Sequence, residues 1–102
     1  MIAGDSRNNA ERQLRLKLID AMLSEHGRLQ REHLCQAFGI SMPCASRDIR
    51  HYREINGTGV QYNASERYWG VTDDFKPMDG LLAMPAREFI TTLEHLFNVK
   101  LV

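Results

Sequence analysis

The sequence predicts a small α+β fold in which three helices precede a β-hairpin and a fourth helix follows it. Apolar residues recur at three- and four-residue spacings in four separate stretches, which is the period of an amphipathic helix. Two short runs of aromatic and β-branched residues flank a polar turn, as they do in a hairpin. With 102 residues the chain has room for one domain with a modest core.

The composition is that of an ordinary globular protein, with 43% hydrophobic and 25% charged residues. The polar start of the chain lacks the apolar segment of a signal peptide, and no apolar run approaches the roughly 18 residues that cross a bilayer. We therefore expect a cytoplasmic protein without membrane contact. The formal net charge is zero, so a nucleic-acid partner would have to bind a local basic patch.

The first helix is predicted from about residue 9 to residue 25, after a flexible tail over residues 1–10. Gly27 ends it, since glycine suits the left-handed position after a helix. Its apolar stripe comprises Leu14, Leu18, Ile19, Met22 and Leu23.

Two short helices separated by a tight turn are predicted next, over residues 31–38 and 42–53. Gly39 breaks the first of them, and Ser41 is a good N-cap for the second. Pro43 is tolerated because it lies in the first turn, where its missing N–H is not needed. The predicted inward-facing residues are Leu34, Ala37, Phe38, Ala45, Ile49 and Tyr52.

Strands at residues 60–63 and 67–71 are predicted to form the hairpin, and a last helix runs from about residue 84 to residue 98. The order of helix, helix, glycine turn, helix and hairpin is that of a winged helix-turn-helix, in which the hairpin is the wing. We assign residues 11–77 to this domain and residues 78–102 to an additional C-terminal helical segment.

The third helix of such a fold lies in the major groove of double-stranded DNA and must offer hydrogen-bond donors on its outer face. Arg47 and Arg50 lie on one side of this helix, able to meet a guanine edge or a phosphate. Asp48 is expected to form an ion pair with a nearby arginine rather than to contact DNA. The other predicted contacts around this helix are Ser41, Met42, Cys44, Ser46 and His51.

Two further groups of DNA contacts are predicted outside the third helix. Gln30 and Arg31 open the second helix, where a phosphate binds favourably to the helix N-terminus. Asn63, Ser65 and Arg67 lie in the hairpin, within reach of the minor groove or the backbone. The alternative is that the hairpin only covers the core.

The apolar C-terminal helix either completes the core of the domain or forms a dimer interface, and we expect the interface. A two-fold homodimer reads both halves of a pseudo-palindromic operator. The predicted interface residues are Phe89, Ile90, Leu93, Leu96 and Phe97.

The sequence has no glycine-rich phosphate loop, no nucleophile elbow and no zinc-type spacing of cysteines and histidines. We therefore expect no catalytic residues, no cofactor and no metal, and a protein that is not an enzyme. Two alternatives stay open. One is a winged helix used for protein contacts instead of DNA, and the other is a switch in which oxidation of Cys44 blocks DNA binding.

Two motifs carry a family resemblance. Phe38-Gly39-Ile40-Ser41 forms the turn, and the third helix reads Ala45-Ser46-Arg47-Asp48-Ile49-Arg50-His51-Tyr52. Together they resemble the N-terminal DNA-binding domain of DeoR-type regulators, and most of all the WYL-domain regulators of phage-defence loci. The similarity covers about residues 12–77, including Tyr62-Asn63, Arg67-Tyr68 and Phe75-Lys76-Pro77.

This resemblance implies a bacterial or mobile-element transcriptional regulator that binds DNA, with a dimeric repressor expected. Those regulators continue into a ligand-sensing domain, which residues 1–102 do not include. A stand-alone regulator and a piece of a longer one are both open.

Overall fold

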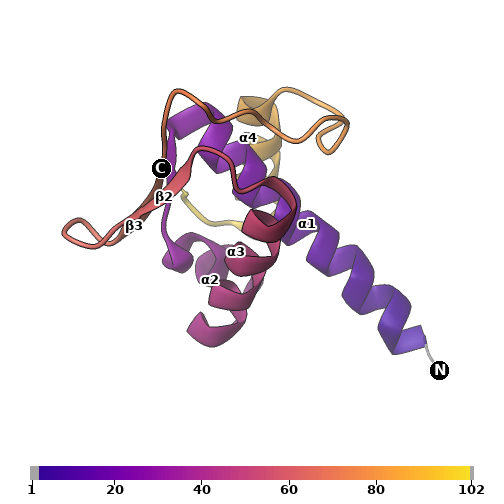
Figure 1. Cartoon of the computed structure of the whole chain (residues 1–102). Helices are drawn as coiled ribbons and strands as arrows, with labels where there is room; N and C mark the ends of the chain where they lie inside the picture. The colour runs from indigo at the N-terminus through magenta and orange to yellow at the C-terminus, as the bar shows by residue number, and fades with distance from the viewer. Residues whose placement is uncertain (1–2, 102) are drawn as a thin grey trace.

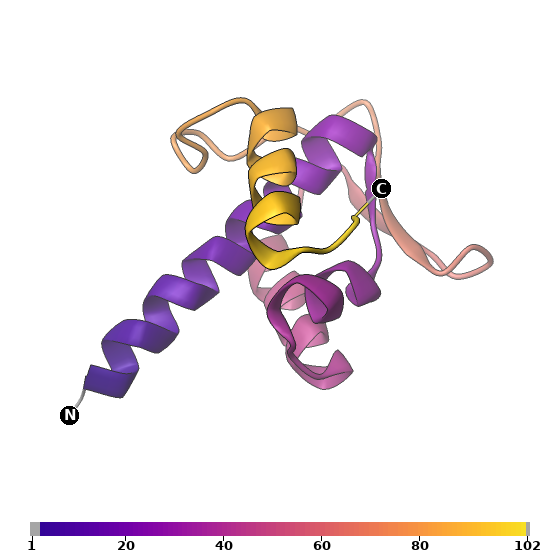
Figure 2. The same ribbon diagram turned by 180° about the vertical axis from the view of Figure 1, so that it is seen from behind.

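Helix α1 (Ala3–His26) is the element around which the rest of the chain packs (Figure 1). The structure is a computed structural model and describes residues 3–101. The second half of α1 lies in the core, with Leu18 and Ile19 fully buried, whereas its first half extends away from the other elements (Figure 2). Residues 3–10, predicted as a flexible tail, continue this helix, and residues 1 and 2 of that tail lie outside the described residues. Adding turns to an existing helix costs much less than starting one, which explains the extension.

The helix-turn-helix is formed by α2 (Arg31–Phe38) and α3 (Met42–Asn56). Gly39 ends α2 in the left-handed region at φ 67°, and its N–H donates to the carbonyl of Cys35 at 2.9 Å. The hydroxyl of Ser41 then caps α3 by accepting from the N–H of Cys44. Both caps agree with the sequence prediction. Helix α3 continues past its predicted end at residue 53 to Asn56, because no helix-breaking residue lies between Arg53 and Gly57.

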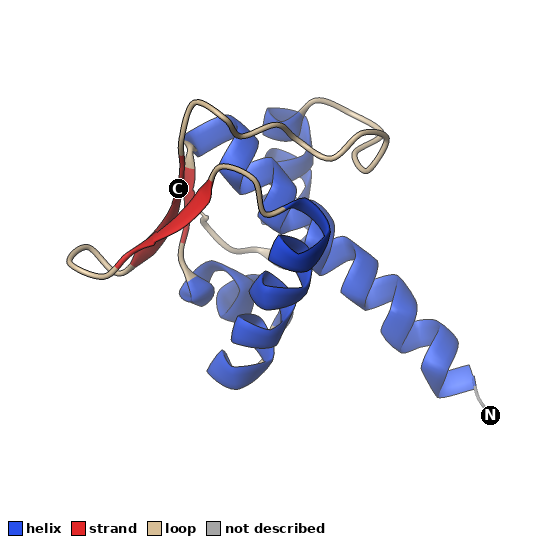
Figure 3. Cartoon of the chain, in the orientation of Figure 1, coloured by secondary structure: helices blue, strands red, loops and turns tan. Residues whose placement is uncertain are grey.

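A three-stranded antiparallel sheet lies beside the helix pair (Figure 3). The hairpin consists of β2 (Val60–Asn63) and β3 (Tyr68–Val71), close to the predicted strands. The third strand, β1 (Arg28–Leu29), pairs with β3 and places the strands in the order β1-β3-β2. Two residues are too few to show a strand period, so the sequence pattern did not reveal β1.

Helix α4 (Ala86–Phe97) packs against α1 and α2 and completes the core of the domain. Phe89, Ile90 and Leu93 are buried within this one chain. The prediction that these three residues form a dimer interface is therefore wrong, because an amphipathic stripe looks the same whether it covers its own core or a partner. Leu96 and Phe97, the other two predicted interface residues, remain 68% and 37% exposed.

A buried polar cluster attaches the segment between the sheet and α4 to the helices. Asp20 of α1 accepts from the hydroxyl of Tyr52 at 2.6 Å and from the backbone N–H of Met78 at 2.9 Å, both through Oδ1. Asn56 donates to the Tyr52 hydroxyl and to the carbonyl of Lys76. Within residues 3–101, none of the helices is both long and apolar enough to cross a membrane.

Candidate nucleic-acid interface

Helix α3 has one face in the core and one face in solvent, as a recognition helix requires. Ala45, Ile49 and Tyr52 are buried, and Arg47 and Arg50 are exposed on the outer side. Among the side chains that the structure describes, neither of these arginines forms an ion pair. The outer face of the first three turns therefore presents two uncompensated positive charges. Ser41 is exposed at the start of this face, and the half-buried residues at its margins are Met42, Cys44, Ser46 and His51.

Asp48 lies on the inward side of α3 and does not offset those charges. Its Oδ2 accepts from Nε of Arg15, in α1, at 2.5 Å, and Arg15 also donates to Glu11. Burial lowers the pKa of Arg15, but the hydrogen bond and the negative charge of Asp48 outweigh burial and hold the pKa above its ordinary value. The expected ion pair thus forms with an arginine of the first helix, which the sequence did not identify, and not with Arg47 or Arg50.

A groove separates α3 from the hairpin, and its four lining residues come from four elements, α2, α3, β2 and β3. Arg31 at the start of α2 donates from Nη1 to the hydroxyl of Ser46 in α3 at 3.2 Å. Tyr62 and Trp69 form the hairpin side, with ring centroids 4.9 Å apart. The guanidinium of Arg53, also in α3, lies 4.5 Å from the centre of the Trp69 ring. The sequence predicted Arg31 and Ser46 as DNA contacts but not Tyr62 or Arg53. The Tyr62–Trp69 pair depends on the strand register, and the contact of Arg53 with Trp69 depends on how α3 packs against the sheet.

The turn of the hairpin presents the three predicted wing residues, Asn63, Ser65 and Arg67, on the surface. The Asn63 side-chain oxygen accepts from the backbone N–H of Glu66 at 3.0 Å, so it shapes the turn. Arg67 has a left-handed backbone at φ 59°, and its carbonyl accepts from the side-chain Nε2 of Gln30 at 3.5 Å. Gln30 therefore faces the hairpin, next to the groove, and the side chain of Arg67 is exposed.

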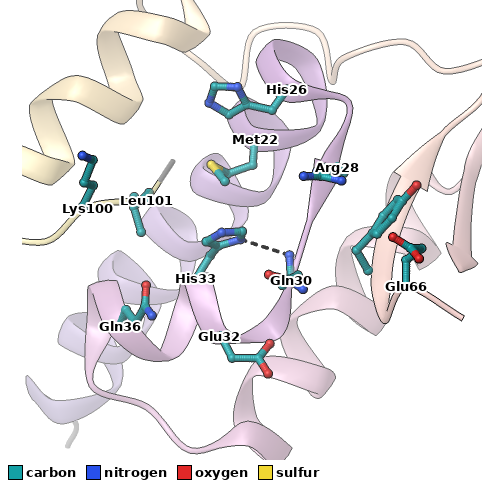
Figure 4. A pocket seen from close by; sticks show the side chains of 11 residues that line it. Met22, His26, Arg28, Gln30, Glu32, His33, Gln36, Glu66, Lys100 and Leu101 are labelled. Carbon is teal, nitrogen blue, oxygen red and sulfur yellow. Dashed lines mark hydrogen bonds between the residues drawn. The ribbon is translucent and has the colours of Figure 1, made fainter. Parts of the chain in front are cut away.

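A second pocket, of about 480 Å³, lies between α2, the sheet and the end of the chain (Figure 4). His33 lies in it, and its Nδ1 accepts from the backbone N–H of Gln30 at 3.0 Å, which caps α2. Burial lowers the pKa of His33, so the neutral ring that this hydrogen bond needs is favoured. The pocket is lined by Met22, His26, Arg28, Gln30, Glu32, His33, Gln36, Glu66, Tyr68, Lys100 and Leu101.

The two thiols lie near the helix-turn-helix. Cys35 is half-buried with its Sγ 3.4 Å from Sδ of Met42, and burial raises the pKa of its thiol. A protonated, half-buried thiol is a weak nucleophile, so Cys35 is poorly suited to oxidation. Cys44 is half-buried on α3, and its role as a switch remains a prediction.

Comparisons with known proteins agree with this geometry. Residues 11–94 match the BrxR transcriptional regulator winged helix-turn-helix domain, a stretch that includes most of α4. The chain is 36% identical over 76 residues to the DNA-binding transcriptional repressor CapW of Stenotrophomonas maltophilia, covering 74% of this chain and 25% of that relative. It is 37% identical over 62 residues to the repressor of the same name from Pseudomonas aeruginosa, covering 61% of this chain and 21% of the relative.

The aligned segments thus span a quarter or less of the length of these relatives. The family model, in contrast, matches most of the present chain and takes in α1 from Glu11, the helix-turn-helix, the hairpin and α4 to Glu94. The predicted winged helix-turn-helix is confirmed, and the chain belongs to the family of BrxR transcriptional regulator winged helix-turn-helix domains.

Proposed function

We propose that this chain binds double-stranded DNA and acts in transcriptional repression, with α3 in the major groove and the hairpin over the flanking minor groove. The observation that carries the proposal is the division of charge on α3. Asp48 is buried against Arg15, while Arg47 and Arg50 are exposed without an ionic partner among the described side chains. Exposed arginines on a recognition helix can meet guanine edges or phosphates.

The local arrangement of charge accounts for DNA binding by a chain whose formal net charge is zero. Attraction to phosphates depends on the cations that lie within a Debye length of the DNA, about 8 Å at physiological salt. The carboxylate of Asp48, buried and paired with Arg15, therefore weakens binding little. We expect a modest salt dependence, set by a few contacts.

We further propose a homodimer on a pseudo-palindromic operator, acting in the cytoplasm. Of the residues predicted to form the interface, Leu96 and Phe97 support it, because both are exposed at the end of α4. Phe97 also packs edge-on against Phe38 of α2, with ring centroids 5.4 Å apart. An interface here would lie next to the helix-turn-helix and fix the spacing of two recognition helices, as a half-site repeat requires.

The experiment is selection of bound sequences from a random pool of duplex DNA, followed by affinity measurements on the selected and on random duplexes. Enrichment of an inverted repeat is the expected result. Binding that is undetectable even at low salt would contradict the proposal and favour a winged helix that contacts protein. A matched variant, Arg87→Ala, removes one exposed charge on α4 and is expected to bind like the unmodified chain.

The thiol switch at Cys44 is tested on the same selected duplex. If oxidation of Cys44 blocks binding, Cys44→Ser abolishes the sensitivity of DNA binding to peroxide, while Cys35→Ser keeps it. Equal sensitivity of the unmodified chain and Cys44→Ser would rule the switch out.

A further inference from the structure

We infer that the groove lined by Arg31, Ser46, Tyr62 and Trp69 binds one backbone phosphate of duplex DNA. In this role Arg31 supplies affinity without reading sequence, whereas Arg47 and Arg50 are left to read bases. The inference rests on the proposed function. It adds a hairpin contact, Tyr62, and separates the phosphate-binding task of Arg31 from the base-reading task of Arg47 and Arg50.

The lining of the groove has the chemistry of an anion site. It contains one guanidinium, from Arg31, and two hydroxyls, from Ser46 and Tyr62, but no carboxylate. One N–H of Arg31 is used on Ser46, at 3.2 Å, and this hydrogen bond directs the guanidinium across the groove. A guanidinium has several further donors, and here they have no ionic partner among the described side chains.

The hairpin side of the groove is held in place before any ligand arrives. Tyr62 stands opposite Trp69 in the register of β2 and β3, and the two rings are in contact. Arg53 lies over the Trp69 ring at 4.5 Å, which fixes the hairpin to α3. Arg53 is thus a positioning residue, and the 47% exposed Tyr62 remains free to donate its hydroxyl to a ligand.

The position of the groove points to a phosphate of the DNA backbone. The groove lies between α3, which the proposed function places in the major groove, and the hairpin, which it places over the minor groove. In duplex DNA a sugar–phosphate strand separates these two grooves. That strand must pass over the space between α3 and the hairpin, so a phosphate comes to Arg31 whenever both elements are engaged.

The first test compares Arg31→Ala and Tyr62→Phe with Arg87→Ala, which removes an exposed arginine of α4 that pairs with Glu25. Affinities for a selected and for a random duplex are measured over a range of salt concentrations. Arg31→Ala is expected to weaken binding to both duplexes about tenfold and to lower the slope of log affinity against log salt by about 1. The ratio between the two duplexes stays unchanged, Tyr62→Phe weakens both to a smaller degree, and Arg87→Ala behaves like the unmodified chain.

The second test changes the DNA and leaves the protein intact. Phosphates of the selected duplex are replaced one at a time by neutral methylphosphonates. One position is expected to weaken binding of the unmodified chain and to have no effect on Arg31→Ala. The effect of one methylphosphonate thus depends on whether Arg31 is present, and we call this dependence coupling. It is insensitive to how well the variant folds, because each comparison uses the same protein on two duplexes.

Four results would overturn the inference. Arg31→Ala with an unchanged salt slope, or with an altered ratio between selected and random duplex, would make Arg31 something other than a phosphate ligand. A fluorescence response of Trp69 to inorganic phosphate without any coupled methylphosphonate would show a site for free phosphate alone. Failure of the unmodified chain to bind any duplex would remove the proposed function together with this inference, which distinguishes it from the other three results.

Discussion

Arg15 of α1 and Asp48 of α3 form an ion pair that joins the first helix to the recognition helix. Nε and Oδ2 are 2.5 Å apart, and the side chains are 12% and 6% exposed. The pair removes the one carboxylate in the first three turns of α3 from the outer face of that helix. It therefore links a feature of the core to the charge that the protein presents to DNA.

Asp48→Asn is expected to lower the free energy of unfolding by about 3 kcal/mol, because the charge of Arg15 stays mostly buried after its partner is lost. Urea unfolding followed by circular dichroism measures this change. Glu11→Gln is the matched control, since Glu11 pairs with the same arginine but is 48% exposed. Its effect should stay below about 0.5 kcal/mol, and equal losses in the two variants would contradict this account of the pair.

Tyr52→Phe removes the hydroxyl that donates to Asp20 at 2.6 Å and is expected to cost about 2 kcal/mol of unfolding free energy. The carboxylate of Asp20 is buried, and its Oδ2 already lacks a hydrogen-bond partner among the described residues. Burial, and then the hydrogen bond to Asp20, raises the pKa of Tyr52, so the hydroxyl donates throughout the neutral range. Tyr62→Phe, at an exposed position, should leave stability unchanged in the same unfolding experiment.

Stability is expected to fall on acidification through His33. Its folded-state pKa lies below the ordinary value of 6.5, mainly because of burial. The unfolded chain therefore takes up the proton first as the pH drops, and stability declines from about pH 6.5 until the pH is below the folded-state pKa. Unfolding free energies measured between pH 7.5 and pH 5 should show this decline. His33→Gln keeps a side chain that can cap α2 but does not titrate, so it should flatten the curve; an equally steep curve would assign the decline to other groups.

Leu96→Glu is expected to shift the proposed homodimer to monomer without changing the thermal midpoint of the monomer, because Leu96 is 68% exposed. Sedimentation velocity over a range of concentrations measures the shift. Leu93→Ala, three residues earlier on the buried side of α4, should instead destabilise the fold by roughly 3 kcal/mol. A chain that is monomeric at every concentration, with or without DNA, would contradict the interface at Leu96 and Phe97.

The helices, their caps and the hairpin were predictable because each has a local signal. Gly39 and Ser41 mark the turn of the helix-turn-helix, and the apolar periods mark the helices. What the sequence could not give was non-local: the partner of Asp48, the pairing of β1 with β3 and the stacking of Arg53 on Trp69 each join residues far apart in the chain. The stripe on α4 was visible in the sequence, but whether it covers its own core depends on how α4 docks on α1.

The exposed face of α3 is the proposed DNA-binding surface, and the substitution Arg47→Ala probes it. Affinity for the selected duplex is measured by fluorescence anisotropy at fixed salt, alongside circular dichroism of the same sample. Binding is expected to be lost or reduced by about a hundredfold, the upper range for a bidentate base contact, while the helix content and thermal midpoint stay unchanged. An Arg47→Ala variant that binds the selected duplex as tightly as the unmodified chain would show that this face of α3 is not the DNA-binding surface.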